Sequence, residues 1–167
     1  RADAVFVILD NAVTAMTGFQ VNPATPAAFA EDRQEIRIEE AARGLGAEAV
    51  VLDPVADVHA AVQALLEAME AGGVRVLVFR NGCATFLQKR IDPGSQPRAR
   101  VDASRCLGDQ CGCNRFCSRI LSCPAILFDP QTGAACIDEQ VCTGCGLCAQ
   151  VCPQGAIFLE SPEGRTP

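Results

Sequence analysis

The sequence has no apolar run long enough to cross a membrane and no excess of positive charge. Its longest uninterrupted apolar run, residues 4–9, falls far short of the roughly 18 residues that a membrane-spanning helix needs. The basic segment that opens a signal peptide is also missing. Acidic residues outnumber basic residues 20 to 14 and the net charge is −6, which argues against nucleic-acid binding because the phosphate backbone requires a dense lysine and arginine surface. We therefore expect a cytoplasmic protein that binds neither membranes nor nucleic acid.

Tryptophan and tyrosine are absent and histidine occurs once, whereas cysteine is abundant. We interpret His59 as a solvated or capping residue on a helix, so that no side chain is a convincing acid or base. There are 11 cysteines, and all but one lie between Cys106 and Cys152. The odd count, the clustering and the missing signal sequence argue against a disulfide framework, which the reducing cytosol would not maintain. The cysteines are therefore expected to bind metal.

Two regions of different composition are separated by residues 91–97, which contain two prolines and a glycine. In the first region, apolar runs of strand length alternate with helical patterns: runs at 4–9, 49–52 and 74–79, helices at about 31–43 and 57–70. This order predicts an α/β fold with a buried parallel sheet. Three strands make a thin domain and no initiator methionine is present, so we expect either the C-terminal piece of a longer polypeptide or a partner that completes the sheet.

The second region contains an internal repeat. Residues 101–106 match residues 137–142, with an aspartate four positions before a cysteine in each copy. Each copy later reaches Cys-Pro followed by an apolar run. Two such copies predict a pseudo-twofold pair of short hairpins and helices, which is a small α+β domain.

The second copy carries an iron–sulfur signature. Cys142, Cys145, Cys148 and Cys152, followed by Pro153, reproduce the bacterial ferredoxin run C-x₂-C-x₂-C-x₃-C-P. The two-residue spacers bring three thiolates around one cluster, whereas the fourth cysteine of such a run ligates the other cluster of a pair. A structural zinc site is the alternative, but zinc motifs rarely pack four cysteines at this spacing.

The first copy is irregular, because it holds five cysteines: Cys106, Cys111, Cys113, Cys117 and Cys123. By the repeat, Cys123 is expected to join the cluster of the second run, and Cys152 to complete the cluster of the first. Cys106 and Cys117 take the outer places of the first cluster, and the spacing does not decide between Cys111 and Cys113 for the middle one. We predict two [4Fe-4S] clusters, with a vestigial or three-iron first cluster as the alternative.

Two further cysteines, Cys83 and Cys136, lie outside both runs. We expect them to be packed thiols, because free cysteine behaves as a small buried hydrophobic residue. Cys83 has a second interpretation as a residue beside a ligand cleft, since it follows the strand that ends at Phe79.

Residues 8–20, with the sequence ILDNAVTAMTGFQ, resemble a stretch of the thiamine-diphosphate 2-oxoacid:ferredoxin oxidoreductases, most closely of the indolepyruvate branch. Asn22-Pro23, residues 78–83 and the ferredoxin-like end extend the resemblance over nearly the whole chain. It implies oxidative decarboxylation of a 2-oxoacid, an aryl one such as indolepyruvate, to an acyl-CoA, with electrons passed through two clusters to ferredoxin. It also implies a second oxidoreductase subunit, and thiamine diphosphate with Mg²⁺ as cofactors.

The resemblance also assigns roles to the loop after the first strand. By position, Asn11 would supply its side-chain oxygen and Val13 its backbone carbonyl to Mg²⁺, and a hard cation prefers such oxygen ligands. Met16, Thr17 and Gly18 would line the cofactor. The Gly-Asp-Gly or Gly-Asp-Ser motif that supplies a further metal ligand in this family is absent from the sequence, so we expect the chain alone to bind thiamine diphosphate poorly. An electron-transfer module without thiamine chemistry is the alternative function.

The predicted organisation therefore has three parts. Residues 1–97 form the C-terminal part of a thiamine-diphosphate-binding α/β domain. Residues 98–160 form a small ferredoxin-like α+β domain with two clusters, and residues 161–167 form a tail.

Overall fold

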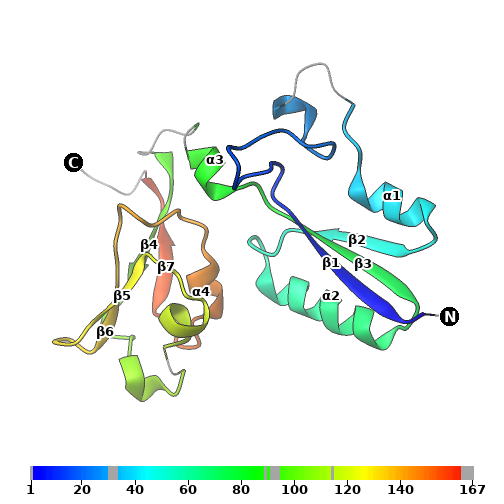
Figure 1. The fold of residues 1–167 in the computed structure, drawn as a ribbon. Coiled ribbons are helices and arrows are strands. Elements are labelled where there is room, and N and C mark those ends of the chain that lie inside the picture. Colours follow the sequence, from blue (N-terminus) through cyan, green and yellow to red (C-terminus); the bar gives the residue numbers. More distant parts are fainter. Residues whose placement is uncertain (1, 30–33, 89, 91–94, 114, 163–167) are drawn as a thin grey trace. The chain divides into compact units, whose positions relative to one another are not determined.

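The computed structural model describes residues 2–29, 34–88, 90, 95–113 and 115–162. The chain divides into two compact units, Arg1–Arg90 and Ile91–Pro167 (Figure 1). Within the described ranges, no helix has both the length and the apolar character needed to span a membrane.

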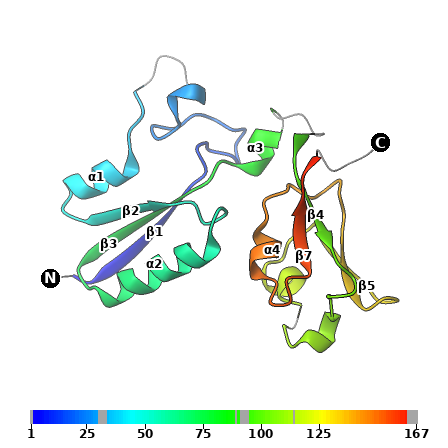
Figure 2. The same cartoon turned by 180° about the vertical axis from the view of Figure 1, so that it is seen from behind.

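The first unit is a three-stranded parallel sheet with one helix on each face (Figure 1 and Figure 2). The sheet order is β1-β3-β2, so that β3 is central and parallel to both neighbours. Its elements are β1 (Ala4–Asp10), α1 (Ile38–Gly44), β2 (Glu48–Leu52), α2 (Val58–Glu70) and β3 (Val74–Arg80). The predicted α/β fold with a parallel sheet is confirmed, and each predicted apolar run forms a strand.

The two faces of β3 pack against different helices because strand side chains alternate in direction. Val76 and Val78 are buried on the face that carries Ile38 of α1. On the other face, Leu77 lies beside Ala68 of α2. Helix α2 begins at Val58, close to the predicted start at residue 57. The side chain of Asp57 accepts a hydrogen bond from the Ala60 N–H at 2.9 Å, which satisfies one of the free N–H groups of the first turn.

Helix α1 differs from the prediction of a helix over about 31–43. It begins only at Ile38, and residues 34–37 are not helical, while residues 31–33 lie outside the described residues. The Ile36 N–H donates to the carbonyl of Pro23 at 2.8 Å, and Arg37 has an extended backbone with φ −78° and ψ 118°. A bond to a distant loop therefore replaces the first helical turn that the apolar spacing indicated.

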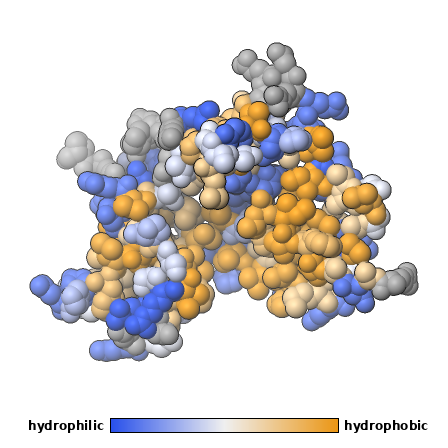
Figure 3. Space-filling model, viewed as in Figure 1, coloured by the Kyte–Doolittle hydropathy of each residue, from blue (hydrophilic) through white to orange (hydrophobic). Residues whose placement is uncertain are grey.

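Strand β1 pairs with β3 along one edge only, and several of its apolar side chains are exposed. Phe6 is 54% and Leu9 is 78% exposed. Figure 3 shows hydrophobic residues gathered over the first unit. This unit thus presents apolar surface beside a small core.

Loops from all three strands meet at one end of the sheet, because the carboxyl ends of parallel strands lie at the same end. Asp53 follows β2 and Asn81 follows β3, and the Asn81 amide donates to both oxygens of the Asp53 carboxylate at 3.0 and 2.9 Å. The long loop after β1 closes on itself through a bridge between Thr14 and Gln20. This end of the sheet holds the polar groups that can face a ligand.

Phe86 anchors the far part of that loop. It lies on α3 (Ala84–Gln88), a helix that the sequence patterns did not predict. Its ring lies 5.7 Å from that of Phe19 and 5.5 Å, edge to face, from that of Phe29 in the short helix η1 (Ala27–Phe29). Such aromatic pairs add specific packing to a small core.

The second unit consists of two small antiparallel sheets and short helices. Strand β4 (Arg98–Val101) pairs with β7 (Ile157–Glu160), and β5 (Ile126–Asp129) pairs with β6 (Ala134–Ile137). The helical elements are the 3₁₀ turn η3 (Gly108–Cys111), the π-helix η4 (Phe116–Ile120) and α4 (Leu147–Val151). The unit is the predicted α+β arrangement.

The internal repeat has a structural counterpart in matching hydrogen bonds. The Asp102 N–H donates to the carbonyl of Ala156, and the Asp138 N–H donates to that of Ala125, each at 2.8 Å. Each aspartate carbonyl then accepts from the N–H of the cysteine four residues later, at 3.0 Å for Cys106 and 2.9 Å for Cys142. The two copies therefore enter their cysteine loops in the same way.

Candidate functional site

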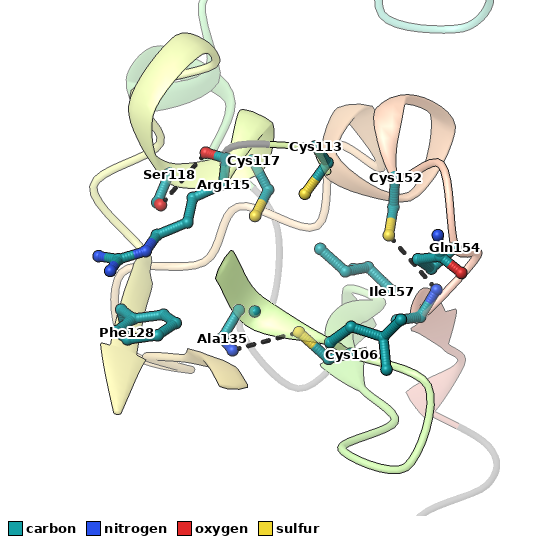
Figure 4. A pocket seen from close by; sticks show the side chains of 13 residues that line it. Cys106, Cys113, Arg115, Cys117, Ser118, Phe128, Ala135, Cys152, Gln154 and Ile157 are labelled. Carbon is teal, nitrogen blue, oxygen red and sulfur yellow. Dashed lines mark hydrogen bonds between the residues drawn. The ribbon is translucent and has the colours of Figure 1, made fainter. Parts of the chain in front are cut away.

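Four cysteines from different elements surround one pocket of the second unit: Cys106, Cys113, Cys117 and Cys152. Figure 4 shows their sulfur atoms facing the space between them. The pocket is lined almost entirely by apolar atoms, with Phe128, Ala135 and Ile157 completing its walls. We call these four residues the first cysteine group.

Backbone amides contact two sulfurs of the first group. The Ala135 N–H donates to Sγ of Cys106 and the Ala156 N–H donates to Sγ of Cys152, both at 3.4 Å. Burial raises the pKa of Cys117, and the neighbouring charges of Cys113, Cys152 and Cys106 raise it further. This environment disfavours a free thiolate at Cys117, and a positively charged metal centre is the partner that would stabilise one there.

A second cysteine group consists of Cys123, Cys142, Cys145 and Cys148. Cys142 and Cys148 are 7% and 6% exposed and belong to the hydrophobic core of the unit. Burial raises the pKa of Cys148 to about 11, and the charges of Cys145, Cys123 and Cys142 contribute to the rise. Cys148 therefore lies near the other three cysteines of its group, as Cys117 does near the other three of the first group.

The cysteine loop of the second group depends on a glycine. Gly144 has φ +72°, and a Cβ built there would lie 2.2 Å from the carbonyl oxygen of Pro97. Only glycine fits this left-handed, close-packed position. Residue 144 therefore sets the path between Cys142 and Cys145.

The chain exchanges one cysteine between the two repeats. Cys123 follows the first run but lies with the second group, whereas Cys152 ends the second run and lines the pocket of the first. Cys113 lines that pocket, and the side chain of Cys111 lies outside the described residues. Cys136 is exposed on β6, so the prediction that it is a packed thiol is wrong, whereas Cys83 in the first unit is half-buried. In the described ranges, no group of three or more His, Cys, Asp or Glu side chains is arranged to hold a metal ion.

The second candidate site is the loop that follows β1. The side-chain oxygen of Asn11 accepts a hydrogen bond from the Val13 N–H at 3.3 Å. Asn11 is exposed, whereas the side chain of Val13 is only 2% exposed. A loop with an exposed amide oxygen at the carboxyl end of a parallel strand suits a hard cation.

Met16, Thr17 and Gly18 form the tip of that loop. Met16 is fully exposed, and the Thr17 hydroxyl donates to the side-chain oxygen of Gln20 at 2.7 Å. Gly18 has φ +119°, a conformation that favours glycine. The tip is fixed by hydrogen bonds at its base and open at its end.

Charged residues behind the loop were not predicted as part of any site. Arg80 bonds both Asp10 and Glu39. Hydrogen bonding to Glu39 and Asp10 raises the pKa of Arg80, and hydrogen bonding to Arg80 lowers the pKa of Glu39. The only signal in the sequence was a charged residue at the end of each apolar run, Asp10 after 4–9 and Arg80 after 74–79.

Residues 1–79 match the family described as "Thiamine pyrophosphate enzyme, C-terminal TPP binding domain", and residues 135–158 match "4Fe-4S binding domain". The fold and these matches define a thiamine-enzyme domain followed by a ferredoxin-like iron–sulfur domain. The chain is also similar to proteins named "Indolepyruvate oxidoreductase subunit IorA". It is 40% identical to those of Pyrococcus horikoshii and Thermococcus kodakarensis over 99% of its length, and 34% identical to that of Archaeoglobus fulgidus over 94%.

The chain is therefore similar over nearly its whole length to indolepyruvate oxidoreductase subunit IorA, and its two family matches correspond to the C-terminal part of that subunit. It spans about a quarter of these relatives, 25% of the two 40% relatives and 24% of the third. No solved structure matches the chain. The family resemblance expected from residues 8–20 and the cysteine runs is confirmed.

Proposed function

We propose that this chain carries two [4Fe-4S] clusters and part of a thiamine diphosphate site in an oxidoreductase that converts a 2-oxoacid and coenzyme A to an acyl-CoA and CO₂. The electrons released would pass through the clusters to ferredoxin. The observation that carries the proposal is the pair of cysteine groups, each with four thiols, in the unit that follows a thiamine-type parallel sheet.

The first cluster would be held by the first cysteine group and the second cluster by the second. Iron–sulfur clusters are bound by four cysteine thiolates, and the exchange of one cysteine between two runs is the pattern of two-cluster ferredoxins. The apolar pocket walls and the N–H···S bonds to Cys106 and Cys152 suit a cluster, because hydrogen bonds to sulfur and low solvent exposure tune its potential.

Asn11 and Val13 would bind the Mg²⁺ that holds the diphosphate, through the side-chain oxygen and the backbone carbonyl. Met16, Thr17 and Gly18 would lie along the cofactor. When bound, thiamine diphosphate supplies the carbanion-stabilising group that decarboxylation of a 2-oxoacid needs. The chain's own residues supply orientation, and a further metal ligand must come from a segment other than these.

The substrate class we propose is an aryl 2-oxoacid such as indolepyruvate. It is supported by the name of the relatives and by the match of residues 8–20 to that branch. A pocket for an aromatic ring must be apolar, and burying such a ring discriminates against a methyl group by about 1.5–3 kcal/mol. A second oxidoreductase subunit and ferredoxin are the proposed partners, in the cytoplasm.

Metal analysis and cofactor binding on the intact assembly test the proposal. We expect about eight iron and eight sulfide per chain, and Mg²⁺-dependent binding of thiamine diphosphate. Iron near half that value, or zinc in its place, would contradict the two-cluster assignment. Full cluster content without any thiamine diphosphate binding would favour a pure electron-transfer module. A higher kcat/KM for pyruvate than for indolepyruvate would overturn the substrate class alone.

A further inference from the structure

Two buried carboxylates share one half-buried arginine next to the loop of Asn11 and Val13. The Arg80 side chain donates from Nε to Oδ2 of Asp10 at 2.8 Å, and from its terminal nitrogens to the two oxygens of Glu39 at 3.3 and 2.7 Å. Asp10 and Glu39 are only 9% and 7% exposed. Buried ion pairs add little net stability relative to apolar side chains of similar volume. Their value here must therefore be sought in the geometry that they fix.

That geometry is the backbone of Ala12, the residue between Asn11 and Val13. Ala12 has φ +69°, in the left-handed region that alanine rarely adopts. Its N–H donates to Oδ1 of Asp10 at 3.0 Å. Its carbonyl accepts from the Thr25 hydroxyl at 2.7 Å. Unfavourable backbone conformations persist where the surroundings hold them in place.

Thr25 holds the loop from the opposite side to Asp10. Thr25 is 3% exposed. Its hydroxyl oxygen accepts a hydrogen bond from the Asn22 N–H at 2.8 Å, and the hydroxyl donates to the Ala12 carbonyl. The Thr25 hydroxyl therefore both donates one hydrogen bond and accepts one. Ala12 is held at its N–H by a carboxylate and at its carbonyl by a buried hydroxyl.

We propose that Arg80, Asp10 and Thr25 are positioning residues for the Mg²⁺–diphosphate loop, a role that rests on the proposed function. Arg80 fixes the carboxylate of Asp10, and Asp10 and Thr25 hold Ala12 in its left-handed conformation. The oxygens of Asn11 and Val13 on either side are thereby set before the cation arrives. Mg²⁺ demands nearly ideal octahedral geometry, so a loop that must first be ordered binds it more weakly.

The test measures how thiamine diphosphate binding to the intact assembly depends on the Mg²⁺ concentration. Binding is detected by calorimetry at a temperature well below the unfolding temperature. We expect Arg80→Gln to raise the half-saturating Mg²⁺ concentration about tenfold or more. Arg75→Gln is the matched control, because Arg75 lies at the other end of β3 and pairs with Glu48. It should leave the midpoint unchanged. A merely structural role for Arg80 would lower the unfolding temperature without moving the Mg²⁺ midpoint of the folded protein.

A second pair of variants tests the same inference where Arg80→Gln fails to fold. Thr25→Val removes the hydroxyl and should raise the Mg²⁺ midpoint, whereas Thr25→Ser keeps the hydroxyl and should restore it. If the wild-type assembly binds thiamine diphosphate but the Mg²⁺ midpoint is unchanged in folded Arg80→Gln or Thr25→Val, this inference is wrong. A wild-type assembly that binds none overturns the proposed function itself.

Discussion

The hydrophobic cores of the two units differ in their residue composition. In the first unit, the core cluster consists of Ala49, Val76 and Val78, packed by further aliphatic side chains. In the second unit, the core cluster includes Cys142 and Cys148, with Cys106, Cys117, Cys123 and Cys152 packed against it. The first core consists of aliphatic side chains alone, whereas the second is built around proposed cluster ligands. Stability and cofactor content should therefore be separable in one unit and inseparable in the other.

The largest expected effect is the loss of structure in the second unit when iron is withheld. Burial raises the pKa of Cys148 to about 11, so this core thiol is protonated at neutral pH when no metal is bound. Binding of the clusters would replace it by a metal–thiolate bond, and metal binding then becomes folding free energy. Hydrogen exchange should show protection lost in residues 98–160 and retained in strands β1 and β3. Equal protection of the second unit with and without iron would remove the contrast between the units.

A smaller effect is expected from removing one ligand. Cys145→Ser should eliminate the second cluster and lower the iron content by about half, since a serine oxygen is a poor replacement for a soft thiolate. Cys136→Ser is the control, because Cys136 is exposed on β6 and belongs to neither cysteine group. Electron paramagnetic resonance of the reduced assembly distinguishes the two clusters. Loss of signal in Cys136→Ser would show that the cysteine groups are wrongly assigned.

The sequence predicted the features that depend on local patterns. The three strands and α2 follow from apolar periodicity and from the cap at Asp57, which act over a few residues. The crossing of Cys123 and Cys152 follows from the repeat alone. The strands and α2 were predictable because their signals are local, and the crossing was expected because the repeat itself relates two distant segments.

Features set by distant contacts were out of reach. The start of α1 is displaced by the bond from Ile36 to Pro23, and Arg80 meets partners 70 and 41 residues away in sequence. The choice between Cys111 and Cys113 depends on the turns around them, where Gly112 and Arg115 both have positive φ, 72° and 55°. The spacing of the cysteines in the sequence does not fix the direction in which such turns point a thiol.

Within the first unit, Asn11→Ala should weaken thiamine diphosphate binding to the assembly by a factor of ten or more, about 1.4 kcal/mol for each factor of ten. The variant removes the one side-chain oxygen that we assign to Mg²⁺, and leaves the second unit untouched. Asn11→Asp keeps an oxygen at that place and should retain most of the affinity. Calorimetry measures both, and the iron content should be the same in each. Wild-type affinity in Asn11→Ala would exclude Asn11 as a ligand.

The smallest expected effect is a pH dependence confined to the first unit. Hydrogen bonding to Arg80 lowers the pKa of Glu39 below its ordinary value of 4.5, so the folded state holds fewer protons than the unfolded state in this range. The pair therefore contributes its full stability above pH 4.5, and the contribution is lost as the pH falls through the lower folded pKa. Glu39→Gln cannot titrate, and should therefore flatten this acid-side decline. The measurement is hydrogen exchange of β3 at several pH values between 3 and 6. It reports on the first unit alone, which is needed because acid also affects the clusters.

Glu40→Gln, on the exposed side of the same helix, is the control that should follow the wild type. If Glu39→Gln declines in parallel with the wild type, the ion pair does not stabilise the end of the sheet that carries Asn11.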